Sequence, residues 1–315
     1  MSKILFLGGN GFIGANLIEK LCFYNEKIIV LVREESDCTN LSNCLNQITL
    51  IKGDFGDEKL IKNILKDYDI EIVIHLITSI LPNSHFNQFI EDTQTNFIQT
   101  IKLIQIISEH SKSKLIFFSS GGTVYGNNKS DYISESDNTE PINYYGWYKL
   151  SIENYIKMES KRNNLEYLIL RPSNPYGKYQ KIHSNQGIIA VSIGKILRKE
   201  NIEIWGDGTT VRDYIYIDDM CDYVFKLIKY SKWNEIYNIG SNIGTSINEI
   251  IYALKDVTKI DFSIIYQQSR NVDVKSNILN IDKLRKVINL NESNTKSIKD
   301  GIYCFWEYVI KNQIN

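Results

Sequence analysis

The sequence has few of the features that mark metalloproteins, secreted proteins or membrane proteins. Its five cysteines include no CxxC pair and its four histidines lack metal-ligand spacing, so we expect no metal and a reducing compartment. The N-terminus enters a strand-like run at once, unlike a signal peptide, and no apolar run approaches transmembrane length. We therefore expect a cytoplasmic protein with no membrane partner.

The sequence also lacks a large net charge, internal repeats and flexible linkers. A formal net charge of -1 provides no basic field for nucleic acid, and no low-complexity segment interrupts the chain. With 43% hydrophobic and 23% charged residues, the composition is that of an ordinary globular protein. A chain of 315 residues is long enough for one large domain or two closely joined ones.

Short apolar runs alternate with helical patterns through the first two thirds of the chain. Several of the runs are apolar on both faces, as in parallel strands that helices cover on both sides. Repeated units of this kind predict an α/β fold with a doubly wound parallel sheet. The predicted strands are 3–8, 27–32, 48–54, 71–76, 114–120 and 166–172, and the predicted helices lie near 12–24, 57–67, 91–110 and 145–163.

The pattern changes after Arg171, where the simple alternation of strands and helices stops. We expect residues 1–172 to form a dinucleotide-binding domain and residues 173–315 to form a smaller mixed α/β lobe. Segment 213–240 is expected to return one strand and one helix to the main domain. The lobe would cover the carboxyl edge of the sheet, where ligand sites of such folds form.

A glycine-rich loop follows the first predicted strand and opens the first predicted helix. Gly8, Gly11 and Gly14 permit a tight turn, close approach of a pyrophosphate and close packing of the helix on the strand. The helix N-terminus, with Phe12 and Ile13, attracts the anion. The loop therefore predicts a dinucleotide cofactor.

The second predicted strand ends in Arg33, with no acidic residue for the adenosine ribose. Arginine suits a 2′-phosphate, which favours NADP(H) over NAD(H), although an ion pair with Glu34 or Glu35 is the alternative. Asp54 and Phe55, just after the third strand, are placed to meet the adenine ring. A simple strand-ending turn is the alternative there.

Tyr145 and Lys149 are four residues apart in the run YYGWYK and would share one helix face. A nearby ammonium favours the phenolate and lowers the tyrosine pKa, which suits proton transfer. The alternative is a solvated helix face with an aromatic anchor.

With these motifs the chain resembles the extended short-chain dehydrogenases/reductases. More narrowly, it resembles the nucleotide-sugar epimerase/dehydratase group, as in UDP-glucose 4-epimerases and dTDP-4-keto-6-deoxyhexose reductases. The further matching motifs are TNF with Asn96, SSGGTVYG (119–126), NPYG (174–177), RDY (212–214) and YNIG (237–240). The resemblance implies a Rossmann domain followed by a nucleotide-sugar-binding lobe.

The resemblance also implies roles for individual residues. Tyr145 would exchange a proton at sugar C4, Lys149 would hold the nicotinamide ribose, and Asn96 would support the lysine through water. Further cofactor contacts would come from Leu76, Ser119 and Pro172. Arg212 and Arg270 would grip the substrate diphosphate. Other implied substrate-binding residues are Thr78, Thr123, Asn174 and Trp205.

Gly121 departs from the pattern of this group, which has Ser or Thr at that position beside the reacting oxygen. Ser120 or Thr123 is expected to replace it, with Thr78 or Ser79 as further candidates. Gly122 and Thr123 stand where the 4,6-dehydratases place an Asp-Glu pair, so dehydration is not expected.

Three functions are consistent with the sequence. The first is reduction of an NDP-4-keto-6-deoxyhexose with NADPH, which the missing acid at Arg33 favours by a narrow margin. The second is a 4-epimerase that retains NAD, and the third is a non-catalytic dinucleotide-binding protein. Both enzymes would serve nucleotide-sugar metabolism for surface polysaccharide such as lipopolysaccharide, and the resemblance implies a homodimer.

Overall fold

The computed structural model describes residues 2–128, 130–184, 186–268, 276–291 and 295–313, and a seven-stranded parallel sheet forms its centre. The strand order is β10-β6-β5-β4-β1-β2-β3. The chain adds β2 and β3 on one side of β1 and then β4, β5, β6 and β10 on the other side, so the winding changes direction between β1 and β4. This is the doubly wound arrangement that the sequence predicts, and the expectation of a Rossmann sheet is confirmed. The strands are β1 (Lys3–Leu7), β2 (Lys27–Val32), β3 (Ile48–Lys52), β4 (Ile72–His75), β5 (Lys114–Phe118), β6 (Tyr167–Pro172) and β10 (Glu235–Ile239).

Each central strand contributes side chains to two separate hydrophobic cores. In β1, Phe6 belongs to one core and Leu7 to the other, and β2 divides Val30 and Leu31 in the same way. Successive residues of a strand point to opposite faces, so a strand that is apolar throughout requires cover on both sides. This requirement explains why the sheet is enclosed between two helical layers.

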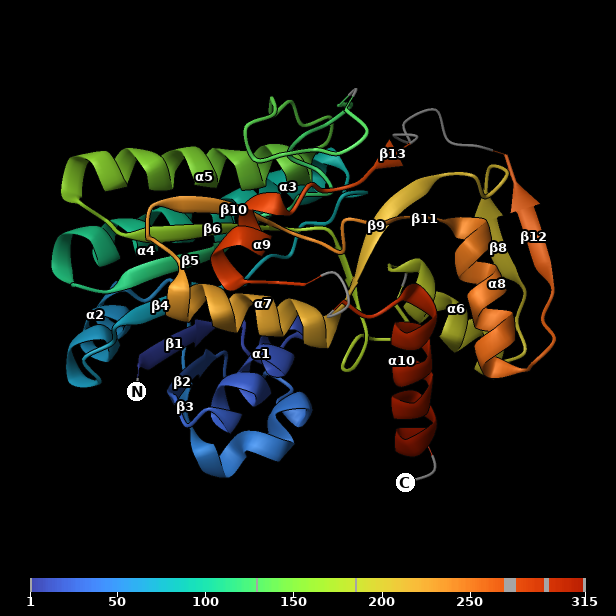
Figure 1. Ribbon diagram of the computed structural model, residues 1–315. Helices are drawn as coiled ribbons and strands as arrows, with labels where there is room; N and C mark the ends of the chain where they lie inside the picture. The colour runs from blue at the N-terminus through green and yellow to red at the C-terminus, as the bar shows by residue number, and fades with distance from the viewer. Residues whose placement is uncertain (1, 129, 185, 269–275, 292–294, 314–315) are drawn as a thin grey trace.

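The two helical layers are built from different parts of the chain (Figure 1). One core contains α1 (Phe12–Phe23) and α7 (Ile217–Tyr230), and α9 (Asp282–Ile288) packs on α7. The other contains α2 (Glu58–Asp67), α4 (Ile98–His110) and α5 (Tyr144–Asn163). Helices α1, α2, α4 and α5 correspond to the predicted helical segments of the first domain. A 3₁₀ segment, η1 (Thr39–Gln47), was not predicted.

The helix predicted near 91–110 begins earlier and contains a wider turn. It consists of α3 (Phe86–Asp92), a π-helical turn η2 (Thr93–Phe97) and then α4. Within it, the hydroxyls of Thr93 and Thr95 donate to the carbonyls of Phe89 and Glu91, at 2.7 and 3.0 Å. Hydroxyl bonds of this kind compete with the helical ladder and bend it, and π turns are frequent at functional sites.

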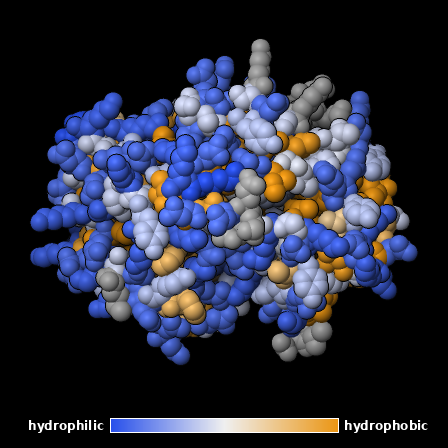
Figure 2. All heavy atoms as spheres, in the orientation of Figure 1, coloured by the Kyte–Doolittle hydropathy of each residue, from blue (hydrophilic) through white to orange (hydrophobic). Residues whose placement is uncertain are grey.

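The smaller lobe lies beyond the carboxyl ends of the main strands. Its β9 pairs with β7, β11 and β13, and β8 forms a separate pair with β12. Figure 2 shows one face of the molecule, with more exposed hydrophobic residues toward the lobe. The lobe elements are β7 (Asn174–Tyr176), α6 (Ile188–Leu197), β8 (Ile202–Trp205), β9 (Val211–Tyr216), β11 (Gly244–Ser246), α8 (Ile247–Thr258), β12 (Ile264–Gln267), β13 (Ser276–Asn277) and α10 (Ile298–Gln313).

The chain crosses between lobe and main domain more than once. Strand β9 of the lobe ends at Tyr216, and α7 of the main domain begins at the next residue. After α7, β10 pairs with β6, and the chain then re-enters the lobe at β11. Within the described residues, no helix is long and apolar enough to span a bilayer.

Candidate active site

The glycine loop forms a cradle at the start of α1. Gly8 adopts a φ of +84°, and a Cβ on Gly14 would lie 2.6 Å from the carbonyl oxygen of Gly8. A Cβ on Gly11 would meet nothing closer than 3.4 Å, and no side chain caps the helix. The first-turn amides, which include those of Phe12 and Ile13, have no acceptor within the helix. The loop therefore fits a diphosphate, and these residues are proposed to hold the cofactor.

The side chain of Arg33 is exposed at the end of β2. Among the ion pairs of the described residues, none joins Arg33 to Glu34 or Glu35. Asp54 forms a turn in which its carboxylate accepts the Gly56 amide at 2.7 Å. The structure therefore has the turn that was the alternative for Asp54, whereas an adenine contact by Asp54 or Phe55 stays a prediction.

Phe55 is buried and packs edge-on against His75, with ring centroids 5.9 Å apart. His75 is enclosed at the end of β4, where its Nε2 lies 2.9 Å from the Thr100 hydroxyl. Burial lowers the pKa of His75 to about 3, so the ring is neutral. The adjoining Leu76 is partly buried, and its amide bonds the carbonyl of Leu7 at 2.9 Å.

Tyr145 and Lys149 lie on one face of α5, as the sequence predicts. The Lys149 ammonium is 5.6 Å from the centre of the Tyr145 ring and donates to the carbonyl of Phe118 at 2.9 Å. The Ser120 side chain lies near enough to the Tyr145 hydroxyl to lower the tyrosine pKa. The proposed catalytic tyrosine therefore has a hydroxyl neighbour just beyond the end of β5.

The pKa of Tyr145 differs from the sequence-based expectation. Burial raises it to about 12, and the neighbouring Ser120 side chain opposes this shift. Burial also lowers the pKa of Lys149 to about 8, while the charges of Asp92 and Glu153 raise it. The expected lowering of the tyrosine pKa by Lys149 is wrong for this structure, because desolvation of the phenolate dominates.

Asn96 is half-buried within the π turn and takes part in a polar cluster with the exposed Ser79 and the buried Asp92. Its amide donates to the Ser79 hydroxyl at 2.7 Å and to the Asp92 carboxylate at 2.8 Å, and Ser79 also bonds Asp92. Asp92 is 3% exposed. The cluster places a carboxylate where its charge favours the ammonium form of Lys149. Support of the lysine by Asn96 stays a prediction.

A cleft of about 510 Å³ opens beside Tyr145, between the carboxyl edge of the sheet and the smaller lobe. Its volume lies in the range of small-molecule sites, which is roughly 300–1,000 Å³. The cleft brings together residues that are far apart in the sequence. The sequence-predicted residues that line it are Thr78, Ser120, Thr123, Tyr145, Asn174 and Arg212.

Arg212 lies on β9, and one of its guanidinium nitrogens donates to the carbonyl of Val211 at 2.8 Å. Two acidic residues that follow it in the sequence, which could have formed an ion pair with it, have other bonds. Asp213 accepts the amide and hydroxyl of Ser241 at 2.8 Å each, and Asp219 pairs with Lys296 at 3.3 Å. Asn174 is held by a bond of its amide to the Asp213 carbonyl at 2.8 Å.

The segment 119–126 connects the end of β5 to the cleft. Ser119 is 3% exposed and donates to Glu153 at 2.5 Å, so its hydroxyl is engaged within the protein. The hydroxyl of Thr123 is buried without a hydrogen-bond partner in the described residues, although the residue lines the cleft. Pro172, at the end of β6, accepts the Gly121 amide at 2.8 Å.

One predicted substrate residue is not brought into the cleft, and a second lies outside the described residues. Trp205 lies on β8, is 43% exposed, and is not among the lining residues, because β8 pairs with β12 away from the sheet edge. Arg270 lies outside the described residues. Sequence reasoning missed Gln180 and Tyr214, which line the cleft. Strand alternation could have found Tyr214, which is two residues beyond Arg212 on β9.

No cluster of three or more His, Cys, Asp or Glu side chains that could hold a metal occurs among the described residues.

Comparison with known proteins adds to this geometry. Residues 4–240 match the model of the family described as NAD-dependent epimerase/dehydratase. The chain is 31% identical over 299 residues to a putative UDP-glucose 4-epimerase of Methanocaldococcus jannaschii, with 95% of each chain covered. It is 30% identical to a dTDP-4-dehydro-6-deoxyglucose reductase of Escherichia coli, again with 95% of each covered.

A solved structure is similar over nearly the whole chain. The UDP-glucose 4-epimerase of Thermotoga maritima with UDP-glucose matches with a TM-score of 0.90 and 30% identity, covering 99% of both chains. Both lobes of the fold are therefore shared with that protein.

Proposed function

The chain belongs to the NAD-dependent epimerase/dehydratase family, and on that premise we propose that it oxidises and reduces C4 of a nucleotide-diphospho-sugar. The observation that carries the proposal is the single cleft that Tyr145, Ser120 and Arg212 line together. It combines a proton-transfer group with a cation suited to a diphosphate.

The cofactor would lie along the glycine cradle, with its diphosphate at Gly11 and the start of α1. When bound, the nicotinamide supplies hydride transfer at the sugar carbon. Lys149 would bind the nicotinamide ribose, and its ammonium is held in place by the carbonyl of Phe118. The family is NAD-dependent, and the exposed Arg33 leaves NADP(H) as the alternative.

Tyr145 would transfer the proton at the C4 oxygen. Its raised pKa favours the protonated phenol, which would donate to the C4 carbonyl in the reductive step. In the oxidative step of an epimerisation the phenolate would accept the proton of the C4 hydroxyl. Ser120 would orient the phenol, and the unpartnered hydroxyl of Thr123 would bind the sugar. Thr78 and Asn174 would complete the polar lining.

Arg212 is the one Lys or Arg side chain among the residues that line the described cleft. It is therefore the proposed ligand of the substrate diphosphate. Arg270, proposed from sequence as a second diphosphate ligand, lies outside the described residues.

Within this reaction class, 4-epimerisation is the first candidate. The similar proteins of M. jannaschii and T. maritima are named UDP-glucose 4-epimerases, the former as putative. Reduction of an NDP-4-keto-6-deoxyhexose, which the sequence favoured, is the second candidate. It is supported by Arg33 and by the E. coli reductase at 30% identity. A non-catalytic role is the least supported, since Tyr145 lines the same cleft as Arg212 and has Lys149 beside it on α5.

The deciding experiment is to purify the protein, identify the nucleotide that accompanies it, and assay both reactions. Tightly held NAD with interconversion of UDP-glucose and UDP-galactose supports the epimerase. NADPH consumption that requires dTDP-4-keto-6-deoxyglucose supports the reductase. Absence of both activities in a protein that binds NAD and NADPH would contradict catalysis at C4 of these sugars.

We also propose a homodimer formed through α3 and α5. Exposed aromatic side chains gather there, with Phe86 56%, Tyr144 40% and Trp147 50% exposed. Phe89 stacks on Tyr144 with centroids 4.9 Å apart. Contiguous apolar patches of this kind mark interaction sites. Light scattering should give twice the monomer mass for the wild type and the mass of a single chain for Trp147→Asp. A monomeric wild type would refute the proposal.

We further propose that the protein works in the cytoplasm, in the synthesis of sugars for surface polysaccharide.

A further inference from the structure

Helix α5 meets the end of β5 at three positions along one face. Tyr145 lies beside Ser120, Lys149 donates to the backbone carbonyl that precedes Ser119, and Glu153 accepts the Ser119 hydroxyl at 2.5 Å. The three helix residues are spaced four apart, so they form a single stripe. Two of them have proposed chemical roles, whereas Glu153 has none.

Glu153 forms a buried ion pair with Arg171 of β6. The guanidinium donates from Nε to one carboxylate oxygen at 3.0 Å and from Nη2 to the other at 2.6 Å. Their side chains are 0% and 2% exposed. Lys157 is a second cation, 3.8 Å from Glu153. Burying two charges costs desolvation energy that their attraction does not always recover, so stability alone is a weak reason for the pair.

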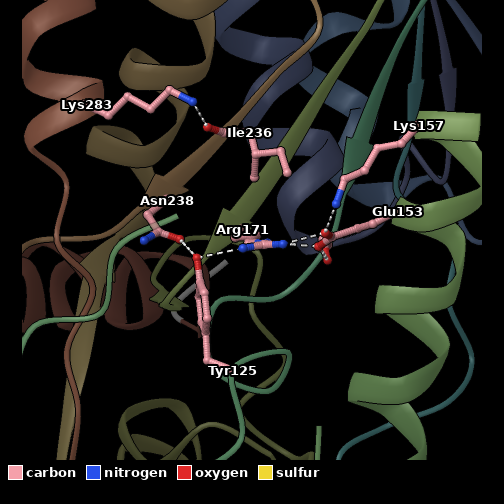
Figure 3. Close-up of polar contacts among 8 residues, drawn as sticks. Tyr125, Glu153, Lys157, Arg171, Ile236, Asn238 and Lys283 are labelled. Carbon is pink, nitrogen blue, oxygen red and sulfur yellow. Dashed lines mark hydrogen bonds and ion pairs between the residues drawn. The ribbon is translucent and has the colours of Figure 1, made fainter. Parts of the chain in front are cut away.

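The same ion pair bonds both ends of the segment that runs from Ser119 to Tyr125, and Figure 3 shows the bond at the Tyr125 end. Its carboxylate accepts the Ser119 hydroxyl, and the remaining guanidinium nitrogen of Arg171 donates to the Tyr125 hydroxyl at 2.8 Å. Ser120 and Thr123, the two residues of this segment whose hydroxyls can face the cleft they line, lie between these anchors. Tyr125 is 1% exposed and does not line the cleft.

The anchor at Tyr125 is itself fixed from the other side. The Tyr125 hydroxyl donates to the Asn238 side chain at 2.7 Å, and that side chain donates to the carbonyls of Ile133 and Asn280 at 2.9 and 3.3 Å. Figure 3 shows Asn238, Tyr125, Arg171 and Glu153 in a continuous row of bonds. The row connects β10 to α5 through the core, so displacement of one member leaves a buried polar group unpaired.

We propose that Glu153 and Arg171 form a clamp that positions segment 119–125, so that Ser120 and Thr123 meet the reacting end of the substrate beside Tyr145. Glu153, Arg171 and Tyr125 are positioning residues, since they line no part of the cleft. The catalytic half of this inference rests on the proposed function, whereas the clamp itself is a property of the fold.

The clamp is tested first without substrate. Tyr125→Phe releases one end of the segment and Ser119→Ala the other, and neither leaves the ion pair without its partner. Hydrogen exchange of the peptide covering 119–126 should become roughly tenfold faster in each variant, the effect of losing about one hydrogen bond.

The matched controls are Tyr237→Phe, a buried tyrosine of β10, and Ser192→Ala, a buried serine whose hydroxyl has no partner among the described residues. Exchange equal to that of the controls would overturn the clamp.

The catalytic consequence is tested with the sugar reaction that the wild type supports. In Tyr125→Phe, kcat should fall at least tenfold, with a smaller rise in KM for the nucleotide-sugar, because Thr123 is displaced whereas binding through Arg212 is untouched. An unchanged kcat, or a fall that tracks the folded fraction alone, would overturn the positioning role. If the wild type turns over neither UDP-glucose nor dTDP-4-keto-6-deoxyglucose, the proposed function fails, and the exchange measurement still decides the clamp.

Discussion

A Cβ on Gly121 would lie 2.5 Å from a methyl carbon of Leu279 and 2.9 Å from the carbonyl oxygen of Arg171. Leu279 is fully buried, and its amide bonds the Asp213 carboxylate at 3.3 Å, so its position is fixed. The glycine is therefore required by packing. A serine at this position, as the family pattern would have it, has no space here.

This fit predicts the cost of restoring the serine. Gly121→Ser should destabilise the protein by about 1–3 kcal/mol, the usual cost of overpacking a core. Leu279→Ala alone should cost about 2–5 kcal/mol through the cavity it leaves. The double variant should cost less than the sum, by about 1 kcal/mol or more, because each change relieves the other. Urea unfolding measures all three, and strict additivity would contradict the contact.

Tyr145→Phe should abolish most of the proposed C4 chemistry while retaining the fold. Loss of a positioned proton-transfer group lowers kcat by about 10²–10⁴-fold. Lys149, the proposed ligand of the nicotinamide ribose, is unchanged in this variant, so affinity for NAD should remain within a few-fold of wild type. Steady-state kinetics and cofactor fluorescence check the two parts. Tyr144→Phe, on the exposed neighbour, is the matched control.

The lowered pKa of Lys149 predicts a limit on the alkaline side of the activity profile. The ammonium form is lost above a pKa of about 8. If the charge is needed, kcat/KM should fall about tenfold per pH unit above that value. Stability has the opposite sign: between pH 8 and the ordinary value of 10.5, the unfolded chain binds more protons, so this group adds stability as pH rises. A rate that stays flat to pH 10 would contradict a role for the charge.

Breaking the Glu153–Arg171 pair should be far more damaging than breaking an exposed pair. Glu153→Gln leaves a buried guanidinium without its carboxylate, which costs about 3–5 kcal/mol. Removing both charges, as in Glu153→Gln with Arg171→Met, should recover part of that loss. The control Glu203→Gln, which breaks the exposed pair with Lys195, should cost at most about 1 kcal/mol. If Glu153→Gln and Glu203→Gln lost the same stability, the buried pair would be no more important than the exposed one.

Substitution of Arg33 tests whether the protein prefers NADP(H) or NAD(H). If the protein uses NADP(H), Arg33→Ala should weaken NADPH binding by roughly tenfold or more, the size of one charge-assisted hydrogen bond, with NADH unaffected. Titration of both cofactors by fluorescence measures this. Equal affinity for NADPH in wild type and variant would remove the main sequence argument for a reductase.

The fold was predictable because its signals are local. Apolar runs that serve two cores, and a glycine loop after the first strand, are visible in short windows of sequence. The Tyr145–Lys149 stripe was predictable for the same reason. The raised pKa of Tyr145 was not, since it depends on burial by elements far along the chain.

Contacts distant in sequence account for the remaining differences. Nothing near Gly121 indicates that Leu279 occupies the space beside it, and the engagement of Ser119 by Glu153 depends on how α5 meets β5. Trp205 was expected to bind the substrate from the family resemblance. In the structure β8 pairs with β12, and Trp205 does not line the cleft.

The passage of β9 directly into α7, followed by β10 and the return to β11, has a consequence for engineering. Neither lobe corresponds to one continuous stretch of sequence, so no single cut separates cofactor binding from sugar binding. Exchanging the region after residue 172 with that of a relative would also replace an edge strand of the Rossmann sheet. A chimera with a new sugar preference would therefore have to be grafted as several separate loops, with β10 and α7 kept native.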